Sequence, residues 1–306
     1  MKQFCTTLIL LVGLATAAAH ELSPVYNPQV PRSMEFCGQK VDLDPAYMFE
    51  RMDRELTALS YTHGSTLLTL KRANRYFPLM APILKENGIP SDMLYLACVE
   101  STLDPTIVSP AKAAGLWQFM PDTGRQYGLE VNDYVDERYH PVKSTVAACK
   151  YLRDAYRKYG SWEAVASSYN AGMGRISREL EAQQVGSSFD LWLVSETTRY
   201  PFRILATKLI FEDPAQYGFH LKADQLYQPL AYETIEVTGP VDDWSAWAVD
   251  HGITYRDLRE ANPWIRAKSL PNKEGRTYQV AVPTKEANVR SKMKYHTYNP
   301  NWISRH

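Results

Sequence analysis

The sequence predicts a mainly α-helical protein that ends in a small α/β module. Apolar residues recur with helical spacing from about residue 46 to residue 211, and few strand-like alternations interrupt them. From residue 232 the pattern changes, because two alternating segments flank two short helical ones. With 306 residues, of which 45% are hydrophobic, the chain can bury a large core and form more than one domain.

The first 19 residues are typical of a secretory signal peptide. Lys2 precedes an apolar run at residues 8–14, and small residues follow up to Ala19. The run is short for a membrane span, so a retained membrane helix is the less favoured alternative. Cys5 lies before the apolar run, whereas a lipid-attachment cysteine would follow it. We therefore expect an exported protein of the periplasm or cell envelope, with no stable membrane span after cleavage of residues 1–19.

The charge balance argues against a nucleic-acid partner. Without residues 1–19 the chain has 33 basic and 34 acidic residues, whereas nucleic-acid-binding proteins usually carry a strong basic excess. Three cysteines remain, Cys37, Cys98 and Cys149, so at least one is unpaired, and their spacing leaves the pairing open. No cysteine and histidine spacing indicates a metal site, and we predict neither a metal nor another cofactor.

Changes in the residue pattern divide the rest of the chain into segments. Residues 20–45 contain four prolines and little periodicity, which predicts an extended lead-in. Residues 46–215 form the predicted helical domain, and residues 216–231 a linker. Residues 232–284 form the small module, and the basic tail at residues 285–306 has no predicted fold.

Glu100 places an acidic side chain at the end of the apolar helical segment "YLACVES". Met93, Leu96 and Glu100 are spaced to share a helix face, and the Asp-Pro pair that follows puts Glu100 in the last turns. Apolar surroundings and the negative end of the helix dipole both raise the pKa of such a carboxyl. A carboxylic acid that is protonated near neutral pH can act as a general acid. On this pattern alone, however, a solvated helix-terminal residue is the better interpretation.

Further motifs follow Glu100 along the chain. "VSPAKAAGLWQFMPDTGRQYGL" begins at residue 108, "SSYNAG" at residue 167 and "ETTRY" at residue 196. Together with "VDERYHPVKSTVAACKYL", they resemble the soluble lytic transglycosylases, and most closely the membrane-bound lytic murein transglycosylase D group. The resemblance covers about residues 46–211. It implies a lysozyme-like helical catalytic domain that binds glycan strands of peptidoglycan.

The resemblance also implies a reaction. Members of this family cleave the β-1,4 bond between N-acetylmuramic acid and N-acetylglucosamine and leave a 1,6-anhydromuramyl end. By position, Glu100 would be the catalytic acid and then the base. The family's substrate-binding positions fall on Ser109, Gln118, Tyr169, Asn170 and Tyr200.

Several of these residues also have purely structural interpretations. Ser109 could only start a turn, although its hydroxyl could instead orient Glu100 or the N-acetyl group. Gln118 lies between two aromatic residues, and burial there would favour a contact with substrate. The family implies that the hydroxyl of Tyr169 points at Glu100. A proline follows Tyr200 where the family commonly has a branched apolar residue, and it could shift the tyrosine ring.

Residues 232–284 resemble a LysM domain, a small module that binds N-acetylglucosamine-containing glycans. The usual Gly-Asp-Thr after the first strand is replaced by "GPVDDW", in a loop that belongs to the family's sugar-binding rim. The module could therefore bind glycan or serve only in packing. If it is independent, a chain that ends near Leu230 should still fold and cleave soluble glycan.

Three functions stay open, and a lytic transglycosylase is preferred. A lysozyme-type hydrolase on the same fold would need a second carboxylate to activate water. The nearest acids along the chain, Asp104 and Asp122, are better interpreted as a turn residue and a helix-start residue. A non-catalytic peptidoglycan-binding scaffold would have no need for Glu100 and the residues around it.

Overall fold

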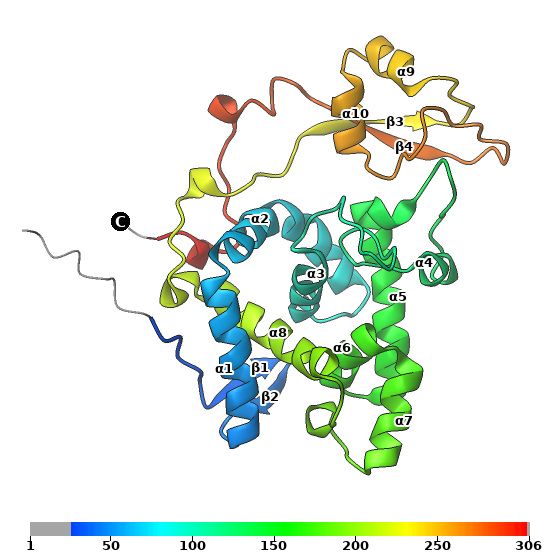
Figure 1. Cartoon of the computed structure of the whole chain (residues 1–306). Coiled ribbons are helices and arrows are strands. Elements are labelled where there is room, and N and C mark those ends of the chain that lie inside the picture. Colours follow the sequence, from blue (N-terminus) through cyan, green and yellow to red (C-terminus); the bar gives the residue numbers. More distant parts are fainter. Residues whose placement is uncertain (1–25, 305–306) are drawn as a thin grey trace, which may run out of the picture.

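Figure 1 shows a helical body with a smaller unit of two helices and two strands at one side. The computed structural model describes residues 26–304, so the predicted signal peptide, residues 1–19, lies outside the described residues. In this part of the chain, no helix is both long and apolar enough to cross a membrane. The helices of the body are α1 (Ala46–Tyr61), α2 (His63–Glu86), α3 (Leu94–Ser101), α4 (Pro121–Gln126), α5 (Pro141–Tyr159), α6 (Trp162–Ala171), α7 (Met173–Gln183) and α8 (Ser195–Glu212).

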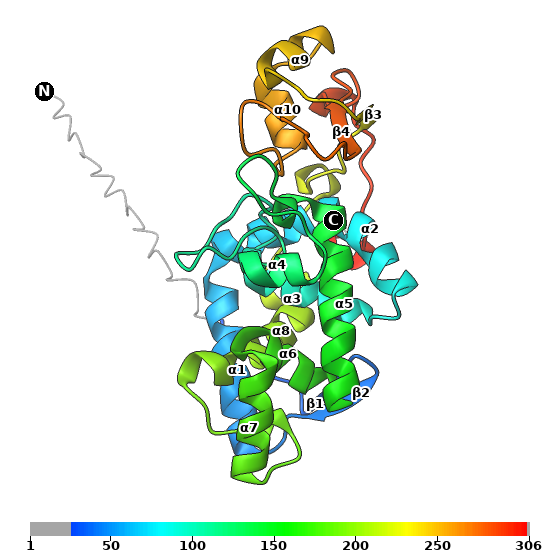
Figure 2. The same cartoon turned by 90° about the vertical axis from the view of Figure 1, so that its right-hand side faces the viewer.

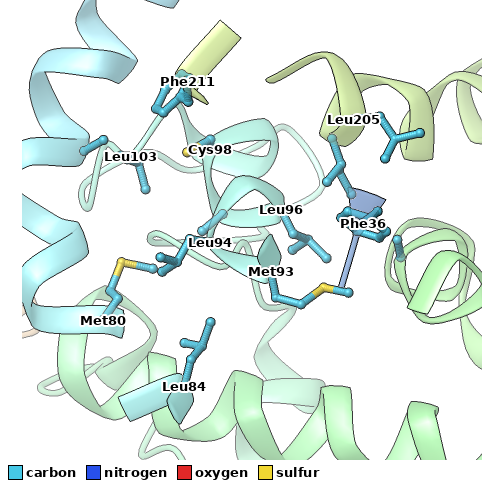
Figure 3. Close-up of a cluster of buried hydrophobic side chains, with 14 of the residues drawn as sticks. Phe36, Met80, Leu84, Met93, Leu94, Leu96, Cys98, Leu103, Leu205 and Phe211 are labelled. Atoms are coloured by element: carbon cyan, nitrogen blue, oxygen red, sulfur yellow. The ribbon is translucent and has the colours of Figure 1, made fainter. Parts of the chain in front are cut away.

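The helix α3 lies at the centre of the body. Figure 3 shows its apolar side chains between those of α2, such as Met80, and those of α8, such as Leu205. A short helix that is apolar on all sides is stable only when other elements cover it. Thr102 and Leu103 take the left-handed backbone conformation directly after α3. This ends the helix near the predicted point and leaves Glu100 in its last turn.

A β-hairpin precedes the helices, where the sequence predicted only an extended lead-in. It consists of β1 (Ser33–Phe36) and β2 (Gln39–Asp42), paired antiparallel. Cys37 and Gly38 both have positive φ, as a two-residue hairpin turn requires. Phe36 is buried in the core of the body. Strands of four residues are too short to show a clear alternation, which explains why the sequence pattern did not reveal the hairpin.

The C-terminal module has the predicted β-α-α-β order. Its elements are β3 (Tyr232–Val237), α9 (Trp244–Asp250), α10 (Tyr255–Ala261) and β4 (Tyr278–Pro283). The two strands pair antiparallel, and Trp244, Leu258 and Val280 are buried beneath them. Figure 2 shows the module on one end of the body, far from α7. The predicted fold class, a mainly α protein with a small α/β module, is confirmed.

The segments that flank the module pack on the body. Leu221 and Leu226, in the predicted linker, are buried in the core of the body. Trp302, in the tail for which no fold was predicted, is 2% exposed and donates its indole N–H to the Phe211 carbonyl at 2.6 Å. A chain that ends near Leu230 would lose this contact, so the structure argues against the expected independence of the helical domain.

Short 3₁₀ helices complete the described chain. They are Ser91–Met93, Glu137–Tyr139, Ser188–Asp190, Pro214–Tyr217, Ala223–Gln225, Arg290–Lys292 and Pro300–Trp302. The last four occur in the segments that flank the module. The three described cysteines are free thiols, with Cys98 and Cys149 buried.

Candidate active site

The candidate site is built around Glu100 at the end of α3. Tyr200, from α8, donates its hydroxyl hydrogen bond to Oε1 of Glu100. Burial raises the pKa of Glu100 to about 7, although the hydrogen bond from Tyr200 opposes this rise. The raised pKa expected from the sequence pattern is therefore found, with burial as the main cause. A substantial fraction of this carboxyl is protonated near neutral pH.

Charged side chains around the carboxyl adjust its pKa in opposite directions. The positive charge of Arg203 lowers the pKa of Glu100, and the negative charge of Glu196 raises it. Arg203 is itself paired with buried Glu55, at 3.2 Å from Nε to Oε2. Burial outweighs both charges as the cause of the raised pKa of Glu100. Neither Glu55 nor Arg203 was identified from the sequence.

The proline after Tyr200 does not move the tyrosine away from the site. Pro201 lies inside α8, which continues to Glu212. Tyr200 is only 3% exposed, and its hydroxyl reaches Glu100 across the contact between α8 and α3. A proline early in a helix removes one backbone donor, and here the helix continues in spite of that loss. The residue whose position the sequence left in doubt is the one that contacts the carboxyl.

Tyr169 lies near Glu100, but its hydroxyl hydrogen bond goes to another partner. It donates instead to the backbone carbonyl of Trp117, at 2.7 Å. Its ring packs edge-on against Tyr151, with a centroid distance of 5.0 Å. It lies near enough to Glu100 for the charge of the carboxylate to raise the tyrosine pKa, although burial is the larger cause. Asn170 is exposed in the last turns of α6.

Ser109 and Gln118 lie on the motif loop, which we define as residues 107–119. Ser109 Oγ accepts a hydrogen bond from the Ala113 amide at 3.0 Å, as the structural interpretation of Ser109 as a turn residue predicts. Gln118 Nε2 donates to the Gly115 carbonyl at 2.8 Å and to the Ile107 carbonyl at 3.3 Å. The loop itself satisfies the N–H donors of this amide, so they need no substrate partner. No contact of either side chain with Glu100 is found in the described part of the chain.

Ser101 connects the motif loop to α3. Its hydroxyl is buried and donates to the Leu116 carbonyl at 2.9 Å and to the Ala97 carbonyl at 3.0 Å. Ser101 follows Glu100 directly, so this contact fixes the loop next to the carboxyl. The sequence analysis did not identify Ser101, although a polar residue at the end of an apolar helix needs a partner. Trp117 is a core aromatic, as expected, and donates to Thr145 Oγ1 at 2.9 Å.

Comparison with known proteins gives two family matches. Residues 79–190 match the transglycosylase SLT domain. This region of the chain includes Glu100, Ser109, Gln118, Tyr169 and Asn170, whereas Tyr200 lies ten residues beyond its end. Residues 233–286 match the soluble lytic transglycosylase C-terminal LysM-like domain, so both resemblances seen in the sequence are confirmed.

The chain is also similar to bacterial proteins of known name. Membrane-bound lytic murein transglycosylase D of Escherichia coli (strain K12) is 32% identical over 243 residues, which is 78% of this chain and 52% of the relative. Membrane-bound lytic murein transglycosylase C of Haemophilus ducreyi is 29% identical over 180 residues, which is 51% of this chain and 48% of the relative. The chain thus spans about half the length of these relatives.

Among solved structures, the 70 kDa soluble lytic transglycosylase of Escherichia coli aligns with a TM-score of 0.38 and 24% identity. The alignment covers 45% of this chain and 24% of that protein.

Proposed function

We propose that the chain is a peptidoglycan lytic transglycosylase in which Glu100 acts first as the acid and then as the base. One observation carries the proposal: a partly buried carboxyl with a pKa of about 7 lies at the end of α3 in hydrogen-bond contact with Tyr200. A general acid works best when its pKa is close to the working pH. The match of residues 79–190 to the transglycosylase SLT domain supports the same activity.

In the proposed reaction, Glu100 gives its proton to the glycosidic oxygen as the bond to C1 of N-acetylmuramic acid breaks. The C6 hydroxyl of the same sugar then forms the new bond to C1, and its proton passes to Glu100. The product is a 1,6-anhydromuramyl end, and the original protonated carboxyl is restored. The attacking hydroxyl is already tethered to the reacting sugar, so no second molecule has to be ordered.

In the proposed reaction, Tyr200 assists Glu100. Its hydroxyl donates to Oε1 of Glu100, which leaves Oε2 to carry the transferred proton. The same hydrogen bond stabilises the carboxylate that forms after the first proton transfer, because it lowers the pKa of Glu100. Tyr200 thus orients the carboxyl and limits its basicity.

The environments of the neighbouring acids favour a lyase over a hydrolase. A glycoside hydrolase usually needs a second carboxylate as nucleophile or to activate water. Asp104 is paired with Arg72 at 2.9 Å, and Asp122 is paired with Arg125 at 2.8 Å. The pair of Asp104 is partly buried, whereas that of Asp122 is exposed on the surface. Glu196 is exposed in the first turn of α8 and is the acid to test in the hydrolase alternative.

Mass spectrometry of peptidoglycan sacculi digested by the purified protein tests the proposal. Anhydromuropeptides as the main products support a lytic transglycosylase, and reducing-end muropeptides identify a hydrolase. If sacculi stay intact with wild-type protein but bind it, the chain is a scaffold. A Glu196→Gln variant that still makes anhydromuropeptides would exclude Glu196 as a required second carboxylate.

The place of action proposed here is the cell envelope. The predicted signal peptide supports it, and so do the relatives, which are named as membrane-bound lytic murein transglycosylases. In the same proposal, the LysM-like module provides a second contact with glycan strands. Fractionation of cells that produce the full chain, with detection by antibody, tests this location.

A further inference from the structure

The motif loop needs support from outside itself. It contains no regular helix, and Lys112, Gly115 and Gln118 all have positive φ. Such backbone conformations are unfavourable for residues other than glycine and persist only where surrounding contacts impose them. The loop carries Ser109 and Gln118 of the proposed substrate site. Whatever fixes its shape also fixes these side chains.

Arg138 provides much of this support. It is 6% exposed, and its Nη1 donates to the Lys112 carbonyl at 2.7 Å and to the Phe119 carbonyl at 2.9 Å. These two contacts fix the motif loop at two points, Lys112 and Phe119. A Cβ atom placed on Gly115 would lie 1.9 Å from the Arg138 carbonyl oxygen, so the two backbones touch. Only glycine fits there.

Asp136 fixes the guanidinium of Arg138. Its two carboxylate oxygens accept from Nε at 2.9 Å and from Nη2 at 2.6 Å. Such a two-point contact sets the orientation of a guanidinium as well as its position. Lysine could keep the charge at this site, but one ammonium group cannot bridge Asp136 and both loop carbonyls.

The C-terminal module holds the segment that presents Arg138. We call residues 130–139 the docking segment. Its Asp136 amide donates to the Trp264 carbonyl of the module at 2.9 Å, and the Arg266 amide donates to the Tyr134 carbonyl at 2.9 Å. The guanidinium of Arg266 also lies 4.1 Å from the centroid of the Tyr139 ring. These contacts join the module to the docking segment of the helical domain.

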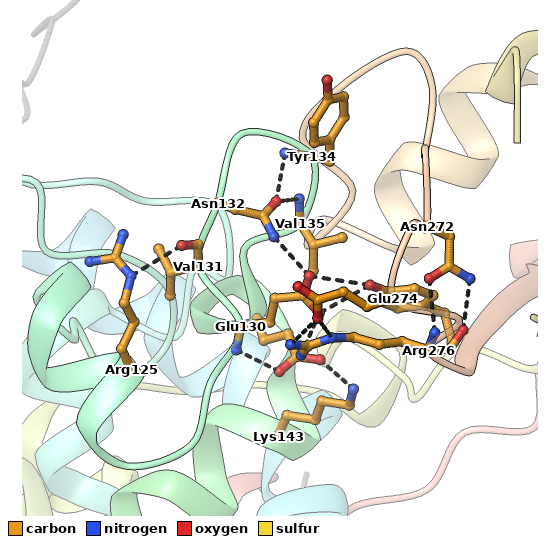
Figure 4. Close-up of polar contacts among 12 residues, drawn as sticks. Arg125, Glu130, Val131, Asn132, Tyr134, Val135, Lys143, Asn272, Glu274 and Arg276 are labelled. Atoms are coloured by element: carbon orange, nitrogen blue, oxygen red, sulfur yellow. Dashed lines mark hydrogen bonds and ion pairs between the residues drawn. The ribbon is translucent and has the colours of Figure 1, made fainter. Parts of the chain in front are cut away.

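A polar cluster and an apolar cluster strengthen this contact. Figure 4 shows Arg276 and Glu274 of the module beside Glu130 of the docking segment. Glu130 accepts from Arg276 at 3.2 Å and from the Tyr278 hydroxyl at 3.0 Å. Ala114 of the motif loop is fully buried in the same hydrophobic cluster as the tryptophans of the module. The motif loop and the module thus share one apolar cluster, and the docking segment that presents Arg138 links them.

We infer that Arg138 is a positioning residue for the motif loop and that the C-terminal module keeps it in place. The module is then a structural part of the proposed active site, in addition to any contact it makes with glycan. Only the cleavage measurement below rests on the proposed function. The structural measurement stands on the geometry alone.

Hydrogen exchange of the full chain tests the inference. Arg138→Lys should raise the exchange rates of the motif-loop amides that are bonded within the loop, such as Ser109 and Ala114, about tenfold. Exchange in α2 and α8 should stay as in wild type. On soluble, uncrosslinked glycan strands, kcat/KM should fall about tenfold, because small displacements of a substrate site are costly. The pH at which activity falls should not move, since the pair of Glu100 and Tyr200 is untouched.

Two exposed arginines of the module provide matched variants. Arg266→Ala removes the contact with Tyr139 and should raise loop exchange in the same direction, by about threefold. Arg256→Ala breaks only ion pairs inside the module, with Asp257 and Glu260, and should change nothing in the loop. A folded Arg138→Lys protein with wild-type loop exchange would overturn the inference. If that variant does not fold, unchanged loop exchange in Arg266→Ala overturns it instead. Absence of cleavage by wild type refutes the proposed function but leaves the exchange result valid.

Discussion

The two parts of the candidate site are held in different ways. The contact of Glu100 with Tyr200 joins two helices of the body, and Tyr200 belongs to the hydrophobic core. The motif loop has little regular structure and depends on Arg138 and on a module more than 100 residues further along the chain. The acid is therefore fixed by the packing of two helices within the body, whereas Ser109 and Gln118 lie on a loop that depends on Arg138 and the C-terminal module. Changes in the two parts should have separable effects.

The largest expected effect is on bond cleavage. Glu100→Gln keeps the shape of the side chain but removes the transferable proton, so kcat should fall about 10²- to 10⁴-fold. Assays on soluble glycan strands measure it, with Glu196→Gln as the matched control in the neighbouring motif. Turnover by Glu100→Gln close to that of the control would remove Glu100 from its proposed role.

Trp302→Ala tests how far the helical body depends on the C-terminal tail. Trp302 is almost fully buried against Phe77 and Phe211, so its truncation should lower the free energy of unfolding by about 3–5 kcal/mol. Trp192→Ala is the matched control, because Trp192 is 83% exposed and should have little effect. Denaturant unfolding gives both values. Equal midpoints for the two variants would show that the tail adds little to the body.

Stability should depend on pH through Glu100. Its folded-state pKa of about 7 lies above the ordinary value of 4.5, so the folded protein binds more protons between these values. Stability should fall as pH rises through this window and then level off above pH 7. Glu100→Gln should therefore be more stable than wild type at pH 8, by on the order of 2 kcal/mol, and should lose this advantage at pH 4. Thermal melts across this range check the sign, and an equal difference at both pH values would argue against it.

Tyr200→Phe should have a smaller and more specific effect. The hydroxyl of Tyr200 lowers the pKa of Glu100, so its loss should move the alkaline limb of activity to higher pH. The rate at neutral pH should fall about tenfold, because the carboxyl loses its orientation. The pH profile of kcat/KM measures both effects. Arg138→Lys serves as the comparison, since it should lower the rate without moving the limb.

The sequence predicted the position of the proposed acid, Glu100, but not the contacts that hold the motif loop in place. The apolar helix around Glu100 is a local pattern, and it predicted the position of the carboxyl and the direction of its pKa shift. The motifs also pointed to Tyr200, which contacts Glu100. Arg138 acts through Lys112, Phe119 and Asp136, and the segment around it is held by Trp264. Folding brings these residues together, and no local sequence pattern predicts their contacts. The burial of the C-terminal tail was not predicted either, because a single tryptophan shows no periodicity.

The pH dependence of kcat/KM for wild type on soluble glycan strands tests the central claim most directly. If Glu100 must be protonated to act, activity should fall above neutral pH with an apparent pKa near 7. Glu196→Gln should move this limb slightly downward, because the negative charge of Glu196 raises the pKa of Glu100. A limb near the ordinary value of 4.5, or activity that persists undiminished to pH 9, would contradict the proposal that Glu100 is the general acid.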